Sequence, residues 1–141
     1  MKLKIAKVDI WAAKIADRPG GLAKSLAALA AARANLQFVL ARRTPESRGR
    51  AIVFIWPVKS AKQKRAARRA GFAKAKGLAG VRVEGADKPG IGAKMTKALA
   101  AARINLRGVS AAAIGKQFVA YIAADSAKDA TKAAAVLRKL R

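Results

Sequence analysis

The stretch Asp17-Arg18-Pro19-Gly20-Gly21-Leu22-Ala23-Lys24 occurs a second time as Asp87-Lys88-Pro89-Gly90-Ile91-Gly92-Ala93-Lys94, 70 positions later (17 to 87). The match continues without a gap into Ala-Ala-Arg at residues 31–33 and 101–103, and then into Asn-Leu at residues 35–36 and 105–106. Two copies of one module therefore fill the 141 residues. Because each copy is long enough for a small fold, the repeat favours a pair of domains over a solenoid of many short units.

The spacing of apolar residues predicts the same order of elements in both copies. In the first copy, Leu22, Leu26 and Leu29 recur at helical spacing after the Asp-Arg-Pro-Gly turn. Ser60 has a side chain typical of a helix N-cap. The predicted elements are, in order, a strand from Val8 to Ala16, a helix from Gly20 to Arg33, strands Asn35–Arg43 and Ala51–Val58, a helix from Ser60 to Gly71, and a short strand Phe72–Lys76.

The second copy repeats this order but stops after its second helix. Its closing strand is either missing or supplied from elsewhere, and residues Lys2–Lys7 are one candidate. The order predicts two tandem ferredoxin-like βαββαβ units of the α+β class, with antiparallel sheets and helices on one face. We assign the units to residues 1–76 and 77–141. The predicted elements of the second copy are strands Leu78–Gly85, Asn105–Ala113 and Gln117–Ala124, and helices that begin at Gly90 and Ser126.

The composition excludes most catalytic chemistry. The chain has no His and no Cys, which removes imidazole acid–base catalysis, thiol nucleophiles, disulfides and nearly all zinc sites. Its seven acidic residues are too dispersed to indicate a paired-carboxylate site or an oxygen-lined metal cage. The glycines between residues 85 and 92 lack the spacing of a phosphate loop or a dinucleotide fingerprint. The sequence therefore predicts a protein that is not an enzyme and uses no metal or cofactor.

The two Asp-basic-Pro-Gly turns are the strongest candidates for a binding site. Proline suits a first helical position, and glycine lets a ligand approach the backbone. The start of a helix leaves free N–H groups and a partial positive charge, and both suit a carboxylate. The alternative interpretation is that Asp17 and Asp87 only cap their helices. The recurrence of the whole turn favours a ligand site.

On these turns, and on the Asn-Leu that opens the next strand of each copy, the chain resembles tandem ACT domains, the small-molecule-binding regulatory modules of amino-acid metabolism. It is most similar to short proteins made of two ACT copies without a catalytic domain. The resemblance implies paired βαββαβ units with an amino acid bound between them, its carboxylate at the turn before the first helix. The nominated ligand-binding residues are Asp17, Arg18, Pro19, Gly20, Gly21, Leu22 and Asn35 in copy one, and Asp87, Lys88, Pro89, Gly90, Ile91, Gly92 and Asn105 in copy two.

Asn35 and Asn105 have two interpretations. They could hydrogen-bond the ligand from a strand that faces the paired unit, or they could adopt the left-handed conformation at a helix exit. ACT domains usually have glycine just after the first helix, whereas this chain has Arg33 and Arg103. Because arginine disfavours a positive φ, either the asparagine takes the left-handed conformation or the turn differs.

Charge suggests a second candidate function. The chain has 31 basic and 7 acidic residues, a formal net charge of +24. Such a field attracts polyanions. The alternative to a regulatory protein is therefore a nucleic-acid-associated protein that uses the helix of residues 59–69. Its contact residues would be Lys62, Lys64, Arg65, Arg68 and Arg69.

The expected partners are a small-molecule amino acid and, in a homodimer, a second copy of the chain. Non-specific nucleic acid is expected to bind at low salt. The chain contains no run of about 18 apolar residues that could span a membrane. Its first residues lack the apolar stretch of a secretory signal. The sequence therefore predicts a cytoplasmic protein without a membrane partner.

Overall fold

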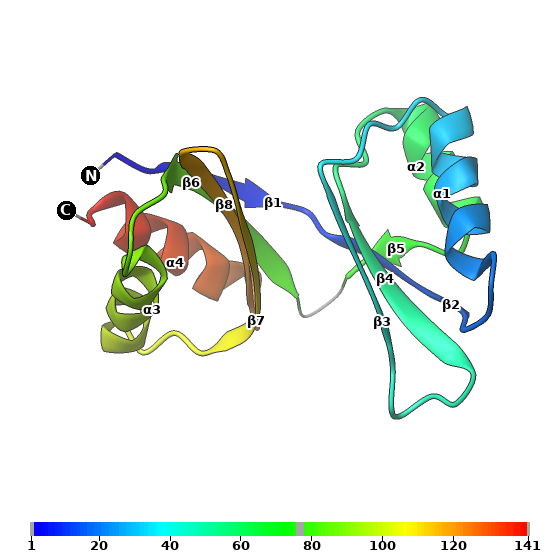
Figure 1. Cartoon of the computed structure of the whole chain (residues 1–141). Helices are drawn as coiled ribbons and strands as arrows, with labels where there is room; N and C mark the ends of the chain where they lie inside the picture. The colour runs from blue at the N-terminus through cyan, green and yellow to red at the C-terminus, as the bar shows by residue number, and fades with distance from the viewer. Residues whose placement is uncertain (1, 76–77, 141) are drawn as a thin grey trace. The chain divides into compact units, whose positions relative to one another are not determined.

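The computed structural model describes residues 2–75 and 78–140 and divides the chain into two compact units (Figure 1). The first-repeat unit is Asp9–Ala75, and the second-repeat unit combines Met1–Val8 with Lys76–Arg141. Each unit has a four-stranded antiparallel sheet and two helices. The expected boundary between residues 76 and 77, and the expected end of a strand at Lys76, lie outside the described residues.

The first-repeat unit has the predicted βαββαβ order. Its sheet order is β3-β4-β2-β5, and both helices cover the same face of that sheet (Figure 1). β2 pairs with β4 along its whole length, whereas β5 reaches only Trp11 and Ala12. The far half of one edge of β2 is therefore left without a neighbouring strand. The elements are β2 (Trp11–Ala16), α1 (Gly21–Ala31), β3 (Phe38–Arg43), β4 (Arg50–Trp56), α2 (Ala61–Arg69) and β5 (Ala73–Lys74).

The core of this unit lies between the sheet and its helices. Val53 and Ile55 alternate with half-buried residues along β4 and are fully buried, as expected for a strand with one covered face. Trp11 and Leu29 are also almost fully buried against them. Because α1 and α2 are rich in alanine, much of the apolar volume comes from the strands rather than from the helices.

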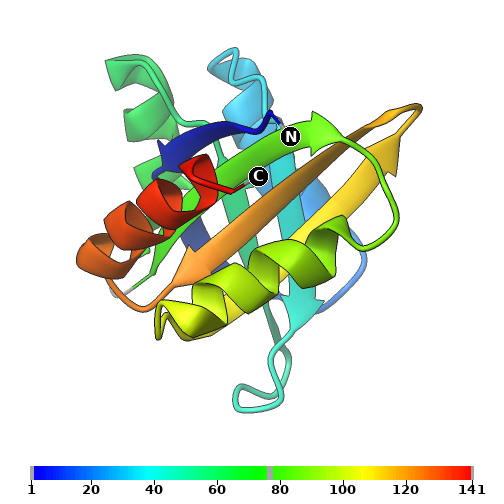
Figure 2. The same cartoon turned by 90° about the vertical axis from the view of Figure 1, so that its left-hand side faces the viewer.

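The second-repeat unit has the same sheet layout in a different chain order. Its sheet order is β1-β6-β8-β7, and Figure 2 shows α3 and α4 side by side over one face of it. β1 holds the place that β5 holds in the other sheet. The elements are β1 (Lys4–Val8), β6 (Ala79–Ala86), α3 (Ile91–Ala101), β7 (Leu106–Ile114), β8 (Gln117–Ala124) and α4 (Ala127–Arg138).

The N-terminal strand closes the second sheet. β1 runs antiparallel to β6, from the pair Lys4↔Glu84 to the pair Val8↔Gly80, and Leu3 and Ile5 pack against the core of that unit. Residues 1–8 therefore belong with the second repeat, and the division into 1–76 and 77–141 moves accordingly. The physical reason is that β6 has no closing strand of its own, so its edge offers unpaired N–H and C=O groups.

The helix exits correct one expectation about the asparagines. Arg33 and Arg103 themselves have positive φ, 61° and 59°, whereas Asn35 and Asn105 do not. The N–H of Arg33 donates to the Ala30 carbonyl, and the N–H of Ala34 donates to the Leu29 carbonyl at 3.0 Å. This pair of bonds is a Schellman motif with arginine in the position that favours glycine. The second repeat forms the same two bonds around Arg103.

The predicted N-cap Ser60 is confirmed for α2, and Ser126, the predicted start of the last helix, is the N-cap of α4. The hydroxyl of Ser60 accepts the N–H of Gln63 at 3.1 Å, and that of Ser126 accepts the N–H of Asp129 at the same distance. Among the described residues, no helix is long and apolar enough to cross a membrane.

Candidate functional site

The turn before each first helix has one backbone geometry in both units. Gly20 and Gly90 are the N-cap residues of α1 and α3, with φ of 87° and 85°. This left-handed conformation costs glycine little and other residues more. A Cβ built on either glycine would meet no atom within 4 Å. The strand-to-helix turn therefore exposes its backbone at the start of each helix.

Each helix start presents free donors. In α1 the N–H of Gly21 is used within the turn and donates to the Arg18 carbonyl at 3.1 Å. The N–H groups of Leu22 and Ala23 donate to no group in the part of the chain that the structure describes. The equivalent donors of α3 are those of Gly92 and Ala93. Free N–H groups and the helix dipole together attract an anion.

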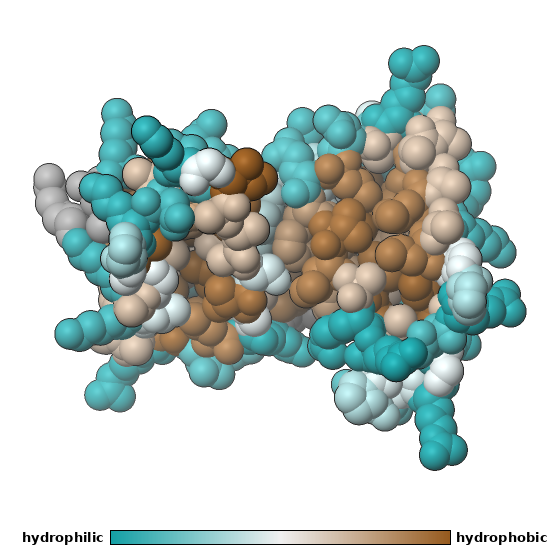
Figure 3. All heavy atoms as spheres, viewed as in Figure 1, coloured by the Kyte–Doolittle hydropathy of each residue, from teal (hydrophilic) through white to brown (hydrophobic). Residues whose placement is uncertain are grey.

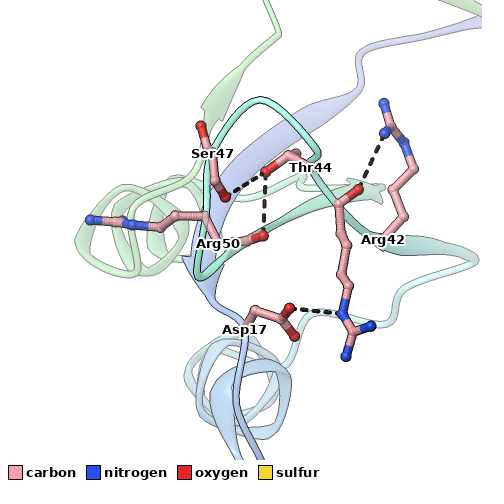
Figure 4. Close-up of polar contacts among 6 residues, drawn as sticks. Asp17, Arg42, Thr44, Ser47 and Arg50 are labelled. Carbon is pink, nitrogen blue, oxygen red and sulfur yellow. Dashed lines mark hydrogen bonds and ion pairs between the residues drawn. The ribbon is translucent and has the colours of Figure 1, made fainter.

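The interpretation that the aspartates cap these helices is wrong, because neither helix has a side-chain cap. The carboxylate of Asp17 instead pairs with the guanidinium of Arg43 on β3, with an Nε–Oδ2 distance of 2.8 Å (Figure 4). Asp87 is exposed. The N–H of Asp17 donates to the carbonyl of Gly49, in the loop between β3 and β4, and the N–H of Asp87 donates to the carbonyl of Lys116, in the loop between β7 and β8. Each turn is therefore tied to the hairpin loop of its own unit.

A pocket of about 800 Å³ opens beside the first of these turns, entirely within the first-repeat unit. We call it the α1–α2 pocket. Its lining comprises Arg18–Gly21 of the turn, the end of β2, and one side each of α1 and α2. Of the nominated residues of copy one, the lining includes Arg18, Pro19, Gly20 and Gly21 but not Asp17, Leu22 or Asn35.

The pocket brings together two features that the sequence had suggested for different functions. Lys62 and Arg69, predicted as polyanion contacts, line the same pocket as the turn predicted to bind a ligand. Lys64, Arg65 and Arg68 do not line it, and Arg68 lies over the ring of Trp11, 5.5 Å from its centroid. Sequence reasoning missed Lys14, Lys24 and Ser25 of the lining. Lys24 and Ser25 lie four residues after Gly20 and Gly21, so they share a helix face with the Asp-Arg-Pro-Gly turn. This spacing is the signal that could have identified them.

The two repeats differ at positions that line or adjoin this pocket. Ser25 stands where the second repeat has Met95, whose larger side chain is buried in the core. β5 leaves the edge of β2 uncovered, whereas β1 follows β6 as far as Glu84. Beyond that point Leu3 lies over Gly85, where an added Cβ would come within 2.7 Å of its Cδ2 atom.

In the second repeat, the nominated residues 87–92 form the turn between β6 and α3. All of them are exposed except Ile91, which is partly buried and packs against the core. Asn105 is exposed just before β7, as Asn35 is exposed after α1. The structure therefore places both asparagines at the surface and not in the α1–α2 pocket.

Each sheet has an edge strand that pairs on one side only among the described residues. β3 and β7 end their sheets, and both expose a valine at matched positions, Val39 at 42% and Val109 at 51%. In the first-repeat unit, Figure 3 shows apolar surface between the β3–β4 strands and α1, with hydrophilic residues above it, below it and on its right. Exposed apolar edges of this kind are typical of protein–protein contacts.

Comparison with known proteins identifies the fold. No protein-family model and no curated protein matches the sequence. Among solved structures, the chain is similar to the ligand-free regulatory subunit of aspartate kinase from Thermus thermophilus (19% identity, TM-score 0.67, 99% of this chain and 97% of that one). It is also similar to a Bacteroides thetaiotaomicron protein (18% identity, TM-score 0.73, 98% and 99% covered).

A third similar structure is a whole enzyme, the aspartate kinase of Clostridium acetobutylicum (16% identity, TM-score 0.62). The match covers 96% of this chain but 33% of that enzyme. At these identities the likeness concerns the fold. Among the described residues, no group of three or more acidic side chains is placed to hold a metal ion.

Proposed function

We propose that this chain, whose two units have the fold of tandem ACT domains, is a non-catalytic regulatory protein that binds an amino acid. One observation carries the proposal: both units place a left-handed glycine and free helical N–H groups at the same exposed turn. The ligand carboxylate would accept hydrogen bonds from those groups, since a helix N-terminus favours a negative charge. A cytoplasmic location is part of this proposal.

The remainder of the site would come from a facing unit. The uncovered strands β3 and β7, with their exposed valines, offer an apolar surface for pairing, and Asn35 and Asn105 lie next to those strands. Their amides could bind the ammonium and carboxylate groups of a ligand held between units. We therefore propose a homodimer in which the ligand changes how the units pack. The regulatory subunits of aspartate kinase are similar in fold and support this role.

A thermal-shift screen against the twenty amino acids tests the proposal, because a ligand that prefers the folded state raises the melting temperature. High salt suppresses polyanion binding during the screen. A stabilising amino acid is expected. No shift with any of the twenty would contradict the proposal.

Matched glycine variants show whether the turns hold the ligand. Gly20→Ala and Gly90→Ala add a methyl group at the proposed carboxylate site. Gly71→Ala is paired with each of them as the control, since Gly71 also has positive φ and open space around a Cβ but follows α2 and belongs to neither turn. Each pair should lose similar stability. Only the turn variants should lose amino-acid binding.

A further inference from the structure

The α1–α2 pocket collects five basic side chains and no acidic one. None of the five forms an ion pair within the described residues. Asp17 follows β2 directly, but it pairs with Arg43 and does not line the pocket. Unpaired like charges around one cavity repel each other and favour a bound anion. The five residues are Lys14, Arg18, Lys24, Lys62 and Arg69.

The absence of a carboxylate in the lining decides against a zwitterion as the occupant. An amino acid carries an ammonium group, which needs an acceptor such as a carboxylate when it leaves water. In this pocket that group would lie among five cations. A ligand whose charges are all negative avoids this cost. The ligand of this pocket therefore differs in class from the amino acid proposed at the turns.

The placement of the cations favours phosphate. Gly20 and Gly21 bring the N-terminal end of α1 to the pocket, and helix N-termini bind phosphate oxygens readily. Arg18 comes from the turn and Arg69 from α2, so guanidinium groups reach the pocket from two elements. Guanidinium groups bind phosphate through two parallel hydrogen bonds.

The walls of the pocket suit an organic body attached to that phosphate. Five alanines from the two helices and their C-caps line it, and their small side chains leave a shallow apolar surface between α1 and α2. The volume of about 800 Å³ lies within the range of small-molecule sites. An inorganic ion would leave this surface wet. The alanines are Ala28, Ala31, Ala32, Ala66 and Ala70.

We propose that the α1–α2 pocket binds a small organic phosphate, with the phosphate among Arg18, Lys62 and Arg69 and the apolar part against the alanines. The second repeat does not reproduce this lining, because it has Glu84 at the position of Lys14 and Met95 at the position of Ser25. This site includes the turn at Gly20, so in the first repeat the phosphate and the amino acid would compete for one helix start. The turn at Gly90 belongs to the other unit and stays available to the amino acid.

Titration of the full chain with phosphate probes tests this inference. The probes are adenosine 5′-monophosphate, glycerol 3-phosphate and inorganic pyrophosphate, with adenosine as the uncharged control, in about 0.3 M KCl to screen long-range attraction. At least one phosphate ester is expected to bind more tightly than pyrophosphate. No binding by either ester, or equal binding of adenosine, overturns the proposal.

Variants with matched charge changes distinguish phosphate binding at this pocket from general electrostatic attraction to the basic protein. Lys62→Gln with Arg69→Gln removes two charges from the pocket, and Lys64→Gln with Arg65→Gln removes two from the same helix outside it. We expect the first pair to weaken binding about tenfold or more and the second to change it little. An equal loss in both double variants indicates a general electrostatic field and overturns the proposal.

Filling the pocket provides a second test. Ser25→Met copies the residue of the other repeat and should abolish phosphate binding. Ala66→Leu fills the opposite wall and serves if Ser25→Met does not fold. Retained affinity in a folded filling variant contradicts the site. The rise in melting temperature that an amino acid causes, and that Gly90→Ala should remove, is an independent readout. Failure of this proposal and failure of the regulatory proposal therefore give different results.

Discussion

Arg33 and Arg103 are the residues at which the sequence and the backbone conflict. Each takes a positive φ in a Schellman motif, where a side chain costs about 1 kcal/mol relative to glycine. Arg33→Gly and Arg103→Gly should each raise the free energy of unfolding by about that amount. Chemical denaturation at fixed salt measures it.

The control separates backbone strain from charge. Arg33→Gln removes the charge but keeps the side chain at φ 61°, so it should give little of the gain. An equal gain in the glutamine variant would mean that relief of charge repulsion, and not of backbone strain, is responsible.

Gly21 and Gly92 predict opposite effects of one added methyl group. A Cβ on Gly21 would lie 2.3 Å from the Ala16 carbonyl oxygen, whereas a Cβ on Gly92 would meet nothing within 4 Å. Gly21→Ala should therefore destabilise the first-repeat unit by about 1 to 3 kcal/mol. Gly92→Ala should stabilise α3 by up to about 1 kcal/mol, because alanine is the better helix former. Thermal unfolding of both variants checks the signs, and a stable Gly21→Ala variant would show that the turn can move.

At the scale of elements, β1 tests how the second sheet is closed. Ile5 packs against the core of the second-repeat unit, and its neighbour Ala6 is exposed. Ile5→Asp buries a charge and should destabilise that unit by about 2 kcal/mol or more, while Ala6→Asp should have little effect. Hydrogen exchange of the β6 amides locates the change. Unaltered β6 protection in Ile5→Asp would argue that β1 is dispensable.

Local patterns predicted most elements, while long-range pairing did not follow from them. β8 has the predicted bounds, residues 117–124, because its apolar run and flanking turns are local signals. The partner of β1 follows instead from comparing the copies: the second copy lacks a closing strand, which makes Lys2–Lys7 a candidate, and the pairing of β1 with β6 confirms it. The α1–α2 pocket was only partly predictable: an alignment of the two copies shows that Ser25 takes the position of Met95. Whether this smaller side chain opens a pocket depends on the length of β5 and on the position of α2, and both are known only from the fold.

At the scale of the whole molecule, the net charge of +24 acts on two kinds of association in opposite directions. Binding of nucleic acid releases counterions, so its affinity should fall steeply as salt rises. A fluorescent duplex titrated at several salt concentrations measures this slope. Helix α2 stays a predicted contact with nucleic acid, to be tested with Lys64→Gln and Arg65→Gln. A salt-independent affinity would rule out an electrostatic interaction.

Pairing of two copies should show the reverse dependence on salt. Two chains of charge +24 repel each other, and salt screens that repulsion while leaving apolar contact between the exposed edge strands intact. We therefore expect the dimer fraction in sedimentation experiments to increase with salt. Val109→Lys places a charge on the edge of β7 and should abolish the dimer, whereas Ala127→Lys adds the same charge on α4 and should preserve it. A dimer that persists equally in both variants would place the contact away from β7, and the proposed ligand site between units would lose its facing surface.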